Sequence, residues 1–199
     1  ARERMGKLAS NFTVDVDAAV EKACALFGDM LNDMAYLHNP QHPMAAPLFM
    51  CNVNLALYLA LKDEGVDVHD FGTAMLTGLA RAPSQGPQFP EDPDKRASAY
   101  AGFLGMMEET QRNANPGEVV LEESPPEPDT AWGYNITSCA VCHAYAKYDA
   151  MELAPYMCAT DDVQSDKDSQ GLRRHGSIAL GARHCDFRYQ PGGGPRRLA

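Results

Sequence analysis

The chain has 199 residues, of which 45% are hydrophobic and 22% are charged, and it carries a formal net charge of −10 at pH 7. This length and apolar content suffice for a sizeable core and favour a soluble globular protein over a disordered one. The negative charge repels a phosphate backbone, which excludes nucleic acid as the default partner.

The sequence also lacks the usual signals for membrane insertion or export. No run of apolar residues approaches the roughly 18 that cross a bilayer, and Arg2 and Glu3 are not followed by the apolar core of a signal peptide. We therefore expect a cytoplasmic protein with no membrane partner. Six cysteines are too dilute in a chain of this length for a disulfide scaffold, so free thiols are expected.

The first half of the chain has the periodicity of amphipathic helices. Apolar residues three and four apart predict a helix over about 16–34, with Thr13 or Asp15 as its N-cap. A second helix is predicted over about 47–62 and is closed by Gly65.

Two further helices are predicted before residue 117. Asp67 opens the first, and Asp92-Pro93, a cap followed by proline at the first helical position, opens the second. That helix stops at Asn115-Pro116-Gly117. The segments 39–43 and 82–91 are rich in Pro or Gly and are predicted to be loops.

The second half changes to short β-rich runs. Residues 118–122 predict one strand and 132–137 a second, with Trp132, Tyr134 and Ile136 on one face. Ser138 is then predicted to cap a helix that extends over about 139–148.

The end of the chain predicts a β-hairpin. Residues 177–180 and 185–189 are its two strands, and the segment 181–184 is its tight connection. The polar segment 165–170 is expected to be exposed.

This order of elements indicates an α+β fold rather than alternating βαβ units. We predict an N-terminal helical layer packed on a small antiparallel sheet formed by the C-terminal half. The chain is interpreted as a single domain, 1–199, with a mainly helical part at 1–115. A Cys-rich α+β part follows at 116–190, and a flexible tail at 191–199.

Four of the six cysteines lie in the last third of the chain, and two interpretations of them involve a bound group. Cys139-Ala140-Val141-Cys142-His143 fits the pattern of c-type haem attachment, but that chemistry also needs export and a second axial ligand, so haem is not expected. Zinc or an iron–sulfur cluster is the other interpretation. Only one close cysteine pair is present, so a divalent metal stays open and the cofactor unknown. The candidate ligands are Cys139, Cys142, His143, Cys158 and Cys185.

Catalysis by a thiol or a carboxylate is the third interpretation. Cys139 is predicted in the first turn of its helix, where the helix dipole lowers a thiol pKa. His143, one turn later, would share its face. Asp161 or Asp162 would then carry protons.

The order of the motifs resembles a known family. Asn135-Ile136-Thr137-Ser138-Cys139 is followed by Met157-Cys158-Ala159-Thr160-Asp161, by Leu172-Arg173-Arg174-His175-Gly176-Ser177 and by Cys185-Asp186-Phe187. Over about residues 132–189 the chain thus resembles the bacterial L-2-amino-thiazoline-4-carboxylic acid hydrolase family. Ser177 stands where the pattern leads us to expect threonine, and Gly176 and His184 also depart from it.

The resemblance implies hydrolysis of a carbon–nitrogen or carbon–sulfur bond that opens a small carboxylated heterocycle. For that reaction the chemistry of the residues favours Cys158 or Cys139 as the nucleophile and Asp161 as general acid and base. His143 would be a reserve base, and Arg174 a bidentate clamp on the substrate carboxylate. The predicted catalytic residues are Cys158, Asp161, Cys139 and His143, and the predicted substrate-binding residues are Arg174, Cys185 and Asn135. Five of these residues are expected to converge on one pocket: Cys139, Cys158, Asp161, Arg174 and Cys185.

Two alternatives to hydrolysis stay open. One is a lyase or another enzyme that acts on a small sulfur or nitrogen compound, because one scaffold commonly supports several reactions. The other is a sensor domain that binds a metal or a small molecule without turnover. In each case the expected partner is a small molecule, not nucleic acid or membrane, and a homo-oligomer stays open.

Overall fold

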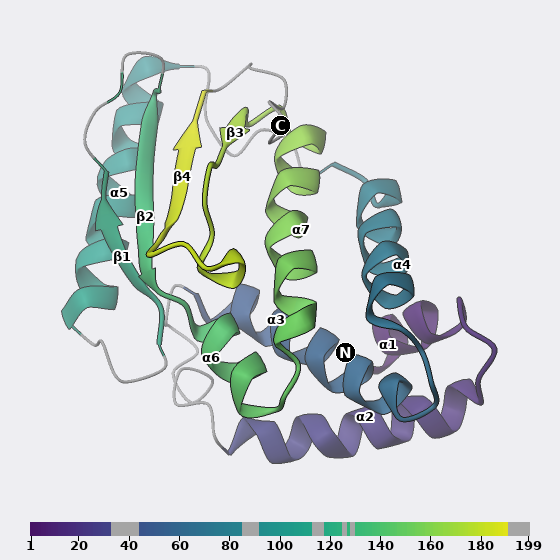
Figure 1. The fold of residues 1–199 in the computed structure, drawn as a ribbon. Helices are drawn as coiled ribbons and strands as arrows, with labels where there is room; N and C mark the ends of the chain where they lie inside the picture. The colour runs from purple at the N-terminus through teal and green to yellow at the C-terminus, as the bar shows by residue number, and fades with distance from the viewer. Residues whose placement is uncertain (33–43, 85–91, 113–117, 125–126, 128–129, 191–199) are drawn as a thin grey trace. The chain divides into compact units, whose positions relative to one another are not determined.

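The computed structural model describes residues 1–32, 44–84, 92–112, 118–124, 127 and 130–190 (Figure 1). The predicted loop at 39–43, the helix end at 115–117 and the tail at 191–199 lie outside the described residues. Most of the loop predicted at 82–91 lies outside them as well.

The described residues form helices followed by a four-stranded antiparallel sheet, which confirms the predicted α+β class. The helices are α1 (Arg2–Ala9), α2 (Val16–Leu31), α3 (Ala45–Lys62), α4 (Val68–Arg81), α5 (Pro93–Arg112), α6 (Ala140–Lys147) and α7 (Ala154–Lys167), with 3-10 turns η2 (Met151–Leu153) and η3 (Ile178–Leu180). The strands are β1 (Val120–Glu123), β2 (Trp132–Ser138), β3 (Leu172–Arg173) and β4 (Cys185–Tyr189). Their order in the sheet is β1-β2-β4-β3.

The chain divides into two compact units. The first comprises residues 1–78 and 141–157, and the second comprises residues 79–140 and 158–199. Within its described residues the first unit is helical. The second unit contains the sheet, helix α5 and most of α7.

In the first unit, α2, α3 and α4 form where the periodicity and the caps predicted them, whereas α1 was not predicted. Of the two candidate caps of α2, Asp15 and Thr13, it is Asp15 whose carboxylate accepts the Ala18 N–H, at 3.1 Å. Asp67 precedes α4 and accepts the His69 N–H at 2.7 Å. Both carboxylates satisfy backbone donors that a helix leaves unpaired at its start.

Helix α3 supplies much of the core of the first unit. Most of its residues from Asn52 to Leu61 are buried, and the chain turns after it at Gly65, where φ is +87°. Among the described helices, α3 alone is long and apolar enough to cross a membrane by length and composition, although no such run was expected. Of that 18-residue window, 56% is buried inside the protein, and core helices pass the same test.

Gly72 on α4 lies against an aromatic ring, so a larger residue at this position should destabilise the protein. A Cβ atom at this position would lie 2.2 Å from Cδ1 of Tyr156, whose hydroxyl is 3.0 Å from His69 Nδ1. The whole ring would have to move, so Gly72→Ala should lower the free energy of unfolding by about 2 kcal/mol. Gly78→Ala on the same helix meets nothing within 4 Å and should raise it by up to about 1 kcal/mol. Urea denaturation of both variants measures the difference, and equal effects would contradict the close packing.

One face of the sheet in the second unit is aromatic. Tyr134 pairs with Phe187 and Trp132 with Tyr189 across β2 and β4, and the ring centres are 4.8 and 4.9 Å apart. Phe103 of α5, which lies along β1 and β2 in Figure 1, packs edge-on against Trp132 at 4.6 Å. The alternation predicted for β2 is thereby confirmed, and this face forms the core of the sheet.

The predicted C-terminal hairpin is wrong in its first strand. Residues 178–180 form the 3-10 turn η3, and β4 lies between β2 and the short strand β3. The carbonyl of Ser177 accepts the N–H groups of Leu180 and Ala182, each at 3.0 Å, so the chain closes on itself. Gly181, at φ +89°, allows that tight return.

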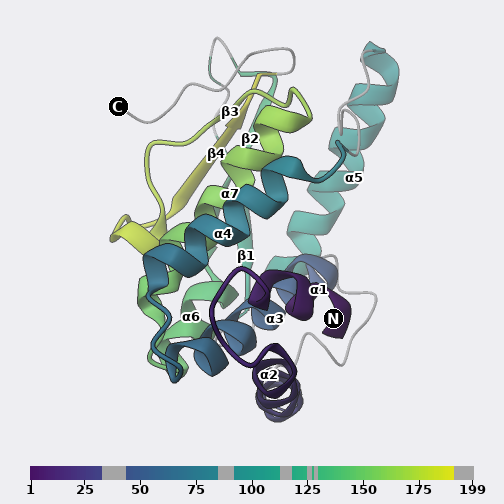
Figure 2. The same cartoon turned by 90° about the vertical axis from the view of Figure 1, so that its right-hand side faces the viewer.

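The segment 165–170, which was predicted to be exposed, ends α7 and turns into β3, and only its residues Asp166 and Ser169 are exposed. Ser165 and Asp168 are buried. The Ser165 hydroxyl accepts the Leu172 N–H at 2.8 Å, and Ser84 donates to Asp168 at 2.6 Å. These bonds fix α7 alongside β3, as Figures 1 and 2 show.

Candidate active site

Helix α7 and the residue after β3 bring four polar groups together. Cys158, Asp161 and Asp162 are three and four residues apart on α7 and therefore share one side of the helix. The side chain of Arg174, only 4% exposed, lies among them. Its Nη1 donates to Asp161 at 3.0 Å, and its Nη2 donates to Asp162 at 3.1 Å and to the Cys158 carbonyl at 2.7 Å. We call these four residues the Arg174 cluster.

Aromatic side chains of the sheet line the Arg174 cluster. The guanidinium carbon of Arg174 lies 5.0 Å from the centre of the Phe187 ring, which is within cation–π range. The hydroxyls of Tyr134 and Tyr189 interact with each other, and burial, aided by the charge of Asp161, raises the pKa of both phenols. Tyr134 was predicted only on the apolar face of β2, yet its hydroxyl lies within electrostatic range of Asp161 and Arg174.

Asp161 has the electrostatic properties of a proton carrier. Burial raises the pKa of its carboxyl to about 6, although Arg174 opposes the shift through its charge and hydrogen bond. The side chain is still 44% exposed, so water reaches the carboxylate, and the shift reflects dense protein around it rather than full exclusion of solvent. A group with a pKa near 6 accepts and returns protons close to neutral pH.

Cys158 is a protonated thiol when the site is at rest. Burial raises its pKa to about 12, which outweighs the lowering effect of Arg174. The charge of Asp161 and the neighbouring Cys185 add to the increase. An ionised thiolate is therefore not preformed, and its formation needs a base.

Cys185 begins β4 beside the same cluster. It is buried, and its sulfur accepts the Ile178 N–H at 3.2 Å. Burial raises the pKa of the Cys185 thiol, and Cys139 and Asp161 contribute to the increase through their charge. Electrostatic coupling thus links Cys139, Cys158, Cys185 and Asp161, which sequence analysis expected at one site.

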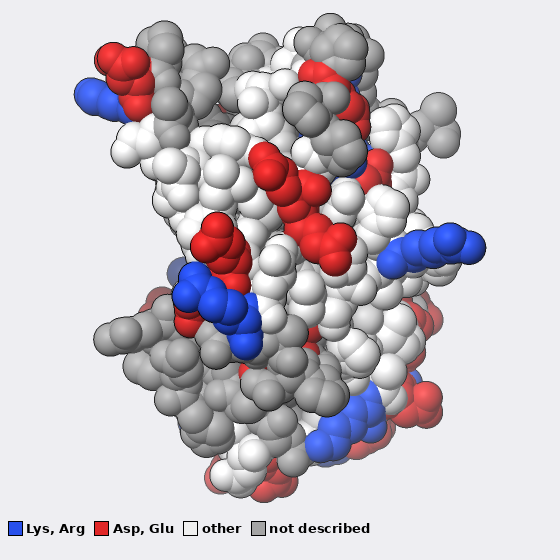
Figure 3. All heavy atoms as spheres, turned by 90° about the vertical axis from the view of Figure 1, so that its left-hand side faces the viewer, with Lys and Arg blue, Asp and Glu red and all other residues white. Residues whose placement is uncertain are grey.

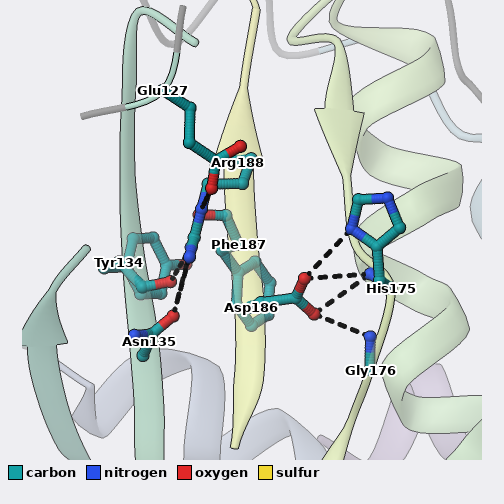
Figure 4. Close-up of polar contacts among 8 residues, drawn as sticks. All are labelled: Glu127, Tyr134, Asn135, His175, Gly176, Asp186, Phe187 and Arg188. Atoms are coloured by element: carbon teal, nitrogen blue, oxygen red, sulfur yellow. Dashed lines mark hydrogen bonds and ion pairs between the residues drawn. The ribbon is translucent and has the colours of Figure 1, made fainter. Parts of the chain in front are cut away.

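Asp186 holds the loop between β3 and β4, which carries Arg174 and Ser177 (Figure 4). Its carboxylate accepts the His175 N–H at 3.0 Å, the Gly176 N–H at 2.7 Å and a contact from His175 Nδ1 at 3.2 Å. A carboxylate with several backbone donors holds a loop firmly. The segment between β3 and β4 is therefore anchored at the two residues between Arg174 and Ser177.

Comparison with known proteins decides the family. The family model described as L-2-amino-thiazoline-4-carboxylic acid hydrolase matches residues 50–189, which is more than half of the chain. The chain belongs to this hydrolase family. The match confirms the resemblance over 132–189 and extends it upstream through α3, α4 and α5. No curated protein and no solved structure matches the chain.

Asn135, a predicted substrate-binding residue of this hydrolase-family chain, points away from the Arg174 cluster. Along β2 it alternates with Tyr134, so it lies on the other face of the sheet. Its side-chain oxygen accepts Nη1 and Nη2 of Arg188, each at 3.1 Å, and Nε of Arg188 donates to Glu127 at 2.6 Å (Figure 4). The structure therefore gives Asn135 a partner that holds β2 to β4.

The remaining candidates lie on or next to α6. Helix α6 begins at Ala140, one residue later than predicted, so Cys139 immediately precedes it. Cys142 is buried, and His143 is exposed; both belong to the first unit, whereas the Arg174 cluster belongs to the second. Within the described part of the chain, no three His, Cys, Asp or Glu side chains are grouped so that they could hold a metal ion. The five ligands considered for a metal centre are thus not gathered into one.

Proposed function

We propose that this protein hydrolyses a small heterocycle that carries a carboxylate, as the family name indicates for L-2-amino-thiazoline-4-carboxylic acid. One observation carries the proposal: the Asp161 carboxylate, with a pKa of about 6, lies one helical turn from the Cys158 thiol and is held by Arg174. A nucleophile with an adjacent base is the arrangement that covalent catalysis requires.

Cys158 is a better nucleophile for this site than water. Its thiol has a pKa of about 12, whereas that of bulk water is about 15.7, so Asp161 removes the thiol proton more easily. Sulfur is also intrinsically more nucleophilic than oxygen. Asp161 therefore serves as the base, and Cys158 attacks as its proton leaves.

Ring opening follows in two balanced steps. Cys158 sulfur bonds to the ring carbon that carries two nitrogens and a sulfur, and the ring C–S bond breaks with its electron pair on the departing sulfur. Asp161 passes the thiol proton to that sulfur. Water then adds to the same carbon, Asp161 takes one of its protons, and the bond to Cys158 breaks. The proton returns to the Cys158 sulfur, and the product is a ureido acid with a free thiol.

The carbon–sulfur bond is the one that we expect to break. A thiol has a pKa near 8.5 and leaves as an anion far more readily than an amine or amide nitrogen. The charge of Arg174 further favours negative charge at this place. Arg174 uses three of its five N–H donors on protein oxygens, so we assign it mainly to holding Asp161 in position.

Turnover of L-2-amino-thiazoline-4-carboxylic acid, followed by mass spectrometry of the product, tests the proposal. The wild-type protein should form a product heavier by one water, and Cys158→Ala should lower kcat at least about a thousandfold. Rapid quenching should reveal a wild-type adduct on the Cys158 peptide.

Cys142→Ala is the matched control, because it removes a thiol from the first unit. It should retain activity. Full activity of Cys158→Ala would contradict the nucleophile, and tight binding of the heterocycle without any product would favour the sensor alternative.

The charge of the chain favours a small molecule over a nucleic acid as its partner. The formal net charge is −10, and on the face shown in Figure 3 lysine and arginine side chains stand in separate groups among acidic and uncharged ones. A nucleic-acid site normally gathers its basic residues on one surface. We therefore propose a small molecule, not a nucleic acid, as the ligand.

A further inference from the structure

Ser177 has a buried hydroxyl that the fold does not use. The residue is 3% exposed, and its Oγ makes no hydrogen bond with any part of the chain that the structure describes. Burying a hydroxyl without a partner is costly, and native proteins rarely do so without a reason.

The backbone on either side of Ser177 is held by hydrogen bonds. On one side the Gly176 N–H donates to Asp186 at 2.7 Å. On the other side the Ile178 N–H donates to the sulfur of Cys185 at 3.2 Å. Both anchors lie within one residue of Ser177, which fixes the position of its Cβ atom.

The Ser177 hydroxyl lies near Cys158. A hydrogen-bonding interaction with the Ser177 side chain lowers the pKa of the Cys158 thiol, so the oxygen is close to the sulfur. The contact does not reach the geometry of a full hydrogen bond in the structure. A neutral thiol is a weak acceptor, whereas a thiolate accepts strongly.

We infer that Ser177 is a positioning residue for Cys158, and that its buried hydroxyl donates to the sulfur when the thiol gives up its proton. The inference rests on the proposed function, in which Cys158 attacks the substrate. Ser177 forms no bond to substrate in this role. It stabilises the sulfur anion that forms as Asp161 takes the proton and again as the second step releases Cys158.

Ser177→Thr and Ser177→Val form a matched pair, because the two side chains have similar size and only threonine keeps the hydroxyl. The readout is the rate at which iodoacetamide alkylates Cys158 between pH 7 and 10, measured by peptide mass spectrometry relative to Cys24. Ser177→Val should slow alkylation of Cys158 about tenfold and lower kcat with little change in KM. Ser177→Thr should stay close to wild type in both.

Ser165→Ala is the structural control, since the buried Ser165 hydroxyl accepts the Leu172 N–H. It should lower Tm without changing alkylation of Cys158, whereas Ser177→Ala should leave Tm unchanged or higher. Equal alkylation of Cys158 in folded Ser177→Val and Ser177→Thr would overturn the inference, whatever the activity. Full turnover by Cys158→Ala would instead defeat the proposed function and leave the alkylation comparison valid.

Discussion

Replacing Asp161 by Asn should lower kcat/KM by about 100- to 10,000-fold, because the site loses the group that takes the proton from Cys158. The side chain keeps its size and its ability to accept a hydrogen bond from Arg174. In the wild-type protein the carboxyl has a pKa of about 6, so kcat/KM should rise with pH up to about 6 and then level off. Steady-state kinetics between pH 4.5 and 8 should show that acid limb in the wild type only.

Asp162→Asn is the control for this prediction, because Asp162 also pairs with Arg174 and its side chain is similarly exposed, at 48% against 44%. The charge of Asp161 is among the main causes of the raised pKa of Cys158, whereas that of Asp162 is not. Asp162→Asn should therefore lower kcat/KM less than about tenfold and keep the acid limb. Equal losses in the two variants would sink the assignment of Asp161 as the proton carrier.

Asp161→Asn should not destabilise the protein at neutral pH. The pKa of Asp161 is raised from 3.8 to about 6 in the folded state, so the folded protein binds the proton more tightly than the unfolded chain. This preference stabilises the fold below pH 3.8 and is lost as pH rises through 6. Asp161→Asn, which mimics the protonated carboxyl, should thus be at least as stable as wild type at pH 7.5. Thermal unfolding at pH 4 and 7.5 measures this, and a large loss of Tm at pH 7.5 would indicate a structural role.

The sequence predicted the elements whose apolar spacing is regular and missed those whose buried face is polar. Helix α2, strand β2 and strand β4 follow simple periods of 3.6 or 2. Helix α7 does not, because it buries Ser165 through a hydrogen bond rather than through apolar contact. Strand β3, with two residues, is too short to have a period and forms only because β4 is beside it.

Site residues that belong to local sequence motifs were predictable, whereas those placed by tertiary structure were not. Cys158, Asp161 and Arg174 appear in ordered motifs, and helical spacing explains why two of them share a face. The hydroxyl of Tyr134 depends on sheet register, and the unpartnered Ser177 depends on how the loop after β3 is anchored. Neither leaves a local pattern in the sequence. Asn135 lies within a motif of the family, yet its strand position turns it to the other face.

Arg174→Met should move the acid limb of the pH profile rather than raise KM. The guanidinium lowers the pKa of Asp161 through its charge and its hydrogen bond, and an opposite charge at this range is worth about 1 to 3 pH units. Without it, Asp161 should titrate above 7, so kcat/KM at pH 6 should fall about 10- to 1,000-fold and recover in part by pH 9.

Arg174→Lys separates this positioning role from the clamp that sequence analysis predicted. Lysine keeps the charge but not the planar fork that bonds Asp161, Asp162 and the Cys158 carbonyl at once. If Arg174 positions Asp161, kcat falls and the acid limb shifts by less than in Arg174→Met, while KM changes little. If Arg174 clamps the substrate carboxylate, KM rises and the limb stays near pH 6. Arg173→Met, one residue earlier on β3, removes an arginine that hydrogen-bonds Gln190 instead and should leave the profile unchanged.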